Sequence, residues 1–77
     1  MQKPVDTRYQ SKHATLVDAK KIAETQSKLK HGAAFGIIED KRENIFYVEE
    51  DYSFIRNFEV FHGEYLDGKF LKPDRHE

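Results

Sequence analysis

Residues 15–32 of this 77-residue chain read TLVDAKKIAETQSKLKHG, and they carry its clearest structural signal. Thr15 followed three residues later by Asp18 resembles a helix capping box, and Gly32 can adopt the left-handed conformation that ends a helix. The apolar residues fall within an arc of about 140° of a helical projection; they are Leu16, Ala19, Ile22, Ala23 and Leu29. The sequence therefore predicts an amphipathic helix from Thr15 to Lys30 that buries this face, Ile22 and Leu29 included.

Strands are predicted on both sides of this helix. Residues 5–11 alternate in polarity, which is typical of a half-buried strand, with a frayed arm as the alternative. After the helix, residues 33–39 and 44–49 are rich in β-forming side chains and are separated by a polar loop, a pattern that predicts an antiparallel hairpin.

The first strand of this hairpin separates small from large residues. Ala34 and Gly36 share one face of the strand, and we expect these small residues to let the helix approach the sheet closely. Phe35 and Ile37 share the opposite face, which then needs a separate cover.

The segment after residue 50 fits two structures. Ser53 as an N-cap and a glycine at its far end favour a short second helix near 53–61. The alternative is a strand through 58–62 that bends at Gly63 and returns through Asp67-Gly68, a strong hairpin signal. We favour a loop or short helix at 51–57 followed by the hairpin.

These elements predict a βαββ-type α+β fold, with one amphipathic helix packed on an antiparallel sheet of three to five strands. The length of the chain allows one domain, residues 1–77, and we expect 1–4 and 72–77 to be disordered tails. The helix from Thr15 followed by a hairpin resembles the strand-helix-hairpin unit of many small phage and mobile-element accessory proteins, and this resemblance implies an accessory role.

Composition narrows the classes of function. The chain has no cysteine, no apolar run near the roughly 18–20 residues of a membrane span, and no apolar region of a secretory signal at its start, so we expect a cytoplasmic protein. Charge is uneven: residues 1–32 hold seven basic and three acidic side chains, net +4, whereas residues 33–77 hold six and eleven, net −5. If the two halves occupy different faces, the molecule is bipolar and its field steers charged partners.

No motif predicts catalysis, a metal or a cofactor. The four histidines lie at least fourteen residues apart, unlike zinc ligands. The carboxylates at 39–40 and 49–51 lack the spacing and the glycine of a calcium-binding loop. No nucleophile elbow or phosphate-binding glycine loop occurs. We therefore expect a protein that is not an enzyme and needs no cofactor.

The aromatic residues suggest a protein interface. Nine of the ten lie from Phe35 onward, more than one helix can cover on a small sheet, so we expect an exposed aromatic patch with an acidic border and Tyr52 among its exposed members. The leading hypothesis is a small protein-binding module or inhibitor, with a homodimer as one form of it. The predicted interface residues are Tyr47, Glu49, Glu50, Asp51, Tyr52, Phe54, Arg56, Phe58 and Tyr65.

Nucleic acid is the alternative partner. Lysines recur on the polar side of the predicted helix and could follow a phosphate backbone. The residues of this alternative site are Lys12, Lys20, Lys21, Lys28 and Lys30. The net charge of −1 and Glu24 among these lysines favour the protein-binding hypothesis.

Overall fold

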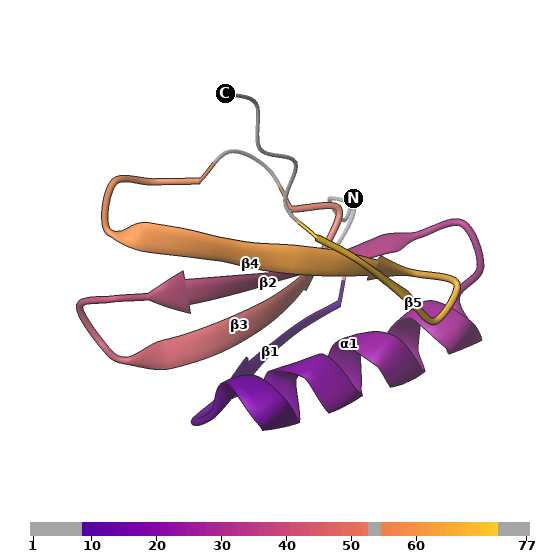
Figure 1. Cartoon of the computed structure of the whole chain (residues 1–77), viewed down its shortest axis with the longest axis horizontal. Helices are drawn as coiled ribbons and strands as arrows, with labels where there is room; N and C mark the ends of the chain where they lie inside the picture. The colour runs from indigo at the N-terminus through magenta and orange to yellow at the C-terminus, as the bar shows by residue number, and fades with distance from the viewer. Residues whose placement is uncertain (1–8, 53–54, 73–77) are drawn as a thin grey trace, which may run out of the picture.

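The computed structural model describes residues 9–52 and 55–72. It contains one helix and one five-stranded antiparallel sheet, which confirms the predicted α+β fold (Figure 1). The elements in chain order are β1 (Gln10–His13), α1 (Leu16–Leu29), β2 (Ala34–Asp40), β3 (Ile45–Glu50), β4 (Glu59–Leu66) and β5 (Lys69–Leu71). The strands lie in the order β1-β3-β2-β4-β5, with α1 against one face. No helix within the described ranges is long and apolar enough to span a membrane.

The predicted helix forms nearly where the sequence placed it. Thr15 has an extended backbone and its hydroxyl accepts the Asp18 N–H (3.1 Å), which confirms the N-cap. The helix ends at Leu29, Lys30 is its cap residue, and Gly32 follows with φ of 87°. A left-handed glycine therefore leads the chain out of the helix, one position later than an ordinary C′ glycine.

Both predicted hairpins are confirmed. Strands β2 and β3 are joined by a turn in which the Asp40 carboxylate accepts the N–H groups of Arg42 (2.9 Å) and Glu43 (3.2 Å). Strands β4 and β5 are joined by Asp67 and Gly68, whose φ angles of 52° and 82° suit the tight turn that an Asp-Gly pair favours.

Two predicted elements differ from the structure. The first strand is Gln10–His13, so it overlaps the predicted segment only at residues 10–11, and residues 5–8 lie outside the described part. The second helix near 53–61 is not found: residues 55–58 are not helical and residues 59–61 belong to β4. The strand alternative wins there because β4 completes its hydrogen bonds against β2, which a single isolated helical turn could not do. Residues 53–54, the predicted tail at 1–4 and residues 73–77 of the predicted tail at 72–77 lie outside the described residues.

The core lies between α1 and one face of the sheet. Its fully buried members are Ala19, Ala23, Phe35, Ile37 and Val48, and the half-buried Leu16, Ile22, Phe46 and Tyr65 pack around them. Phe35 and Ile37 of β2 therefore face the helix, opposite to the prediction. Alanines on the helix, rather than Ala34 and Gly36 on the strand, provide the close approach.

The predicted face of α1 packs on the sheet, Ile22 included, except in its last turn. Leu29 is 73% exposed, whereas Ser27 is fully buried. The β4–β5 turn causes this difference, because the Gly68 N–H donates to Ser27 Oγ (2.8 Å) and brings the turn against the last helical turn. Small Ser27 fits beneath it, and Leu29 is left on the outer side.

Candidate functional site

The face of the sheet away from α1 is the candidate site, because the helix covers only the other face. Residues directly opposite each other in neighbouring strands share a face, so the register assigns every strand position. We call this surface the helix-free face; it comprises Gln10, Lys12, Ala34, Gly36, Ile38, Asp40, Ile45, Tyr47, Glu49, Glu59, Phe61, Glu64, Leu66, Lys69 and Leu71.

The connection between β3 and β4 runs along this face. Its first residue, Asp51, donates its N–H to Ala34 O (3.1 Å) at the start of β2, and Phe58 O accepts the Lys41 N–H (2.9 Å) just beyond the end of β2. The described parts of this connection, residues 51–52 and 55–58, lie on the opposite side of the sheet from α1 (Figure 1). The connection is therefore a partial second cover.

Tyr52 anchors the connection to the centre of the face. A Cβ at Gly36 would lie only 2.5 Å from the Tyr52 ring, so the ring occupies the space that the glycine leaves. The ring also packs on Phe61, with 5.1 Å between centroids, and its hydroxyl donates to Glu64 Oε1 at 2.5 Å. Burial, together with the hydrogen bond to Glu64 and its charge, raises the pKa of Tyr52 well above that of a free tyrosine.

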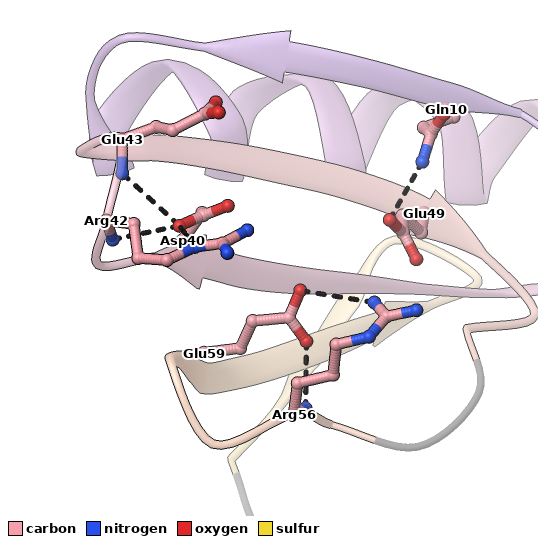
Figure 2. A network of polar contacts seen from close by, with 7 residues as sticks. All are labelled: Gln10, Asp40, Arg42, Glu43, Glu49, Arg56 and Glu59. Carbon is pink, nitrogen blue, oxygen red and sulfur yellow. Dashed lines mark hydrogen bonds and ion pairs between the residues drawn. The ribbon is translucent and has the colours of Figure 1, made fainter.

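Polar contacts orient the side chains of Gln10, Asp40, Glu49 and Glu59 on this face (Figure 2). Gln10 Nε2 donates to Glu49 Oε2 (2.8 Å), which links β1 to β3. Glu59 accepts the Arg56 N–H (2.9 Å) and forms an ion pair with its guanidinium (3.7 Å). The carboxylates of the face are thus oriented by neighbours on adjacent segments.

Asp40 is held in the charged form although it is nearly buried, at 6% exposure. Desolvation raises its pKa, but hydrogen bonds from the Arg42 and Glu43 N–H groups and the Arg42 charge outweigh it, so the pKa of Asp40 lies below its usual value. The Arg42 guanidinium lies 3.6 Å from Asp40 and over the Phe58 ring, 3.6 Å from its centroid. Arg42 therefore ties the end of the connection to the β2–β3 turn.

The structure brings part of the predicted interface together. Tyr47 and Glu49 share the helix-free face, and Asp51, Tyr52, Arg56 and Phe58 belong to the connection that crosses it. Two further members lie elsewhere, and Phe54 is outside the described residues.

Glu50 and Tyr65 point to the face that the helix covers. Glu50 is 6% exposed, accepts the Tyr9 N–H (2.9 Å) and pairs with Lys30 (2.7 Å). Tyr65 packs on Phe70 and the core. Successive side chains of a strand point to opposite faces, so Glu50 cannot share a face with Glu49. This alternation was visible in the sequence.

The five lysines of the alternative site do not form one surface. Lys12 lies on the helix-free face, over the Tyr47 ring at 5.9 Å. Lys20 lies over Phe70, Lys28 pairs with Glu24 (3.4 Å) and Lys30 pairs with Glu50, so three of the helix-side ammonium groups face an internal partner.

The described histidines have separate partners on different elements. His13 Nε2 lies 2.6 Å from Ser11 Oγ, His31 Nδ1 lies 3.2 Å from Asp67, and His62 Nε2 lies 2.9 Å from Glu39. Within the ranges that the structure describes, no group of three histidine or acidic side chains could hold a metal ion.

Comparisons of the chain with protein-family models, curated proteins and solved structures found no match.

Proposed function

We propose that this chain is a non-enzymatic protein-binding module, of the accessory or inhibitor kind, that receives its partner on the helix-free face. The observation that supports this proposal is the half-buried Tyr47 and Phe61 on a face whose only described cover is the 51–58 connection. Aromatic side chains of this kind, surrounded by polar groups, are typical of protein interfaces.

The partner chemistry follows from the charges. The three inner strands place four carboxylates on this face, from Asp40, Glu49, Glu59 and Glu64. Arg42 pairs with Asp40 and Arg56 pairs with Glu59. The basic strand residues of the face, Lys12 and Lys69, lie on the outer strands β1 and β5. A partner surface that carries lysine or arginine around an apolar centre is therefore complementary to Glu49 and Glu64, and the field of these carboxylates speeds its encounter.

Tyr52, which the sequence suggested as an exposed contact residue, has a structural role in this arrangement because its ring fills the space over Gly36. Tyr47 is the better probe of binding, because it is half-buried on the helix-free face and the Lys12 ammonium lies 5.9 Å from its ring centroid. Nucleic-acid binding has less support, because the lysines are divided between two faces and several are paired. An accessory role in a phage or mobile element stays a prediction.

Affinity capture with purified variants tests the proposal. The immobilised chain should retain a specific protein from extracts of its source, and retention should fall at least about tenfold with Tyr47→Ala, a loss of about 1.4 kcal/mol. Thr25→Ala, on the exposed side of α1, is the matched control and should retain the partner. Raising the salt concentration should slow association.

The result that refutes the proposal is equally direct. If the proteins retained by the wild type are retained to the same extent by Tyr47→Ala, the helix-free face is not the docking surface. If retention instead depends on Lys20 and Lys21 and is abolished by nuclease, the nucleic-acid alternative replaces it.

A further inference from the structure

Strand β1 presents an open edge. It is the outermost strand next to β3, and none of the described residues pairs with its other side. The Glu50 N–H donates to Tyr9 O (3.0 Å), so the backbone of Tyr9 faces β3. Because backbone groups alternate along an antiparallel strand, Ser11 and His13 also face β3, whereas the N–H and C=O groups of Gln10 and Lys12 point outward.

We propose that β1 pairs antiparallel with β1 of a second copy of this chain, which joins the two sheets edge to edge. A twofold axis relates the copies, and opposite residues must share a face of the joined sheet. Within Gln10–His13, one register uses both outward-facing residues of each strand: Gln10 lies opposite Lys12 of the second copy. Ser11 then lies opposite its own equivalent, on the axis.

The charges of Lys12 and Glu49 favour this register, and they favour a second copy of the chain as the partner of β1. Gln10 is bonded to Glu49 on the helix-free face, and Lys12 is exposed on the same face. In the proposed register the ammonium of each Lys12 reaches the Gln10–Glu49 pair of the other copy. The neighbouring register would set Lys12 against Lys12, which like-charge repulsion disfavours.

A lysine on an edge strand ordinarily discourages pairing. In the proposed dimer Lys12 favours pairing instead, because the twofold axis places its ammonium beside the Gln10–Glu49 pair of the other copy. A short edge buries little area, so we expect weak, concentration-dependent association. The two helices would lie on one side and the two helix-free faces on the other, which would offer a partner two docking surfaces.

This inference does not depend on the proposed function, because the oligomeric state is measured without a partner. Sedimentation equilibrium of the full chain across a concentration series should show a monomer–dimer equilibrium. Lys12→Glu should raise the dimer dissociation constant by about tenfold or more, since the reversal acts at both symmetric contacts. Glu49→Lys should do the same, and the two changes together should restore the dimer. Lys21→Glu, which makes the same charge change on the exposed side of α1, is the control.

Cross-linking tests the register. The chain has no cysteine, so Ser11→Cys supplies one thiol per copy. Opposed residues of a non-hydrogen-bonded pair have Cα atoms about 4.5 Å apart, within reach of a disulfide. Ser11→Cys should therefore form a disulfide-linked dimer under mild oxidation much faster than Thr25→Cys.

Three outcomes would overturn the proposal. They are a chain that stays monomeric up to about millimolar concentration, a dimer that is unaffected by Lys12→Glu, and a Ser11→Cys dimer that forms no faster than the Thr25→Cys control. Circular dichroism of each variant at the concentration used verifies that it is folded.

Discussion

Tyr52 combines a packing contact and a hydrogen bond in one side chain. Its ring covers Gly36, and its hydroxyl donates to Glu64 (2.5 Å). Charging this hydroxyl inside the fold would place a phenolate beside a carboxylate, which is why burial and Glu64 together raise its pKa. In the unfolded chain Tyr52 titrates near the ordinary tyrosine value of about 10.

This difference predicts a loss of stability at alkaline pH. Above about pH 10 the unfolded state loses its Tyr52 proton first, so the stabilisation that is complete below that pH declines as the pH rises. Urea denaturation at pH 8 to 11 should show a steeper decline for the wild type than for Tyr52→Phe. Tyr65, whose pKa is raised by burial and by Glu24, contributes in the same direction and is common to both proteins. Equal declines would show that Tyr52 ionises as freely in the folded state as in the unfolded chain.

At the scale of the elements, the last turn of α1 and the β4–β5 turn form one joint. Gly68 N–H donates to Ser27 Oγ, and Asp67 Oδ1 accepts the Gly32 N–H (3.3 Å) and lies 3.2 Å from His31 Nδ1. These contacts hold the C-terminal end of α1 against the β4–β5 turn, although the two segments are far apart in the sequence. Packing at this joint, rather than hydrophobicity, selects which residue of the last helical turn is buried.

A pair of substitutions tests this joint. Ser27→Ala should lower the free energy of unfolding by about 1–3 kcal/mol, because it leaves the Gly68 N–H without its acceptor. Leu29→Ala should change it by no more than about 0.5 kcal/mol, because Leu29 is 73% exposed. Chemical denaturation of both variants gives the comparison. A larger loss for Leu29→Ala would restore the helix face that the sequence predicted.

At the scale of the whole molecule, the sheet lies between two covers of different strength. The helix supplies the main core, and the connection from β3 to β4 supplies the second cover through Tyr52 on Gly36 and Phe58 on Arg42. Among the residues that the structure describes, the helix-free face is therefore only partly covered, whereas the helix-covered face holds Phe35, Ile37 and Val48 in full burial.

Gly36→Ala tests the second cover. The added methyl group would displace the Tyr52 ring, and we expect a loss of about 1–3 kcal/mol in the free energy of unfolding. In a background of Tyr52→Ala the same change should cost much less, because nothing then occupies that space. A double-mutant cycle by denaturation measures this coupling. Strict additivity would show that Tyr52 does not rest on Gly36 in solution.

The features that depend on near neighbours were predictable from the sequence. Thr15 caps its own helix, Asp67-Gly68 makes its own turn, and residues 33–49 form a hairpin whose strands are close along the chain. Each rests on backbone geometry and on hydrogen bonds between residues a few positions apart, so local pattern sufficed.

Tertiary packing alone decided which faces meet. Whether Gly36 would lie against the helix or against Tyr52, whether Ser27 or Leu29 would be buried, and whether Glu50 would border a surface or pair with Lys30 all follow from contacts between distant segments. Periodicity marks the two faces of a helix or strand but does not say what covers each of them. That choice was made by the closest fit of small and large side chains across the layers, which only the assembled fold contains.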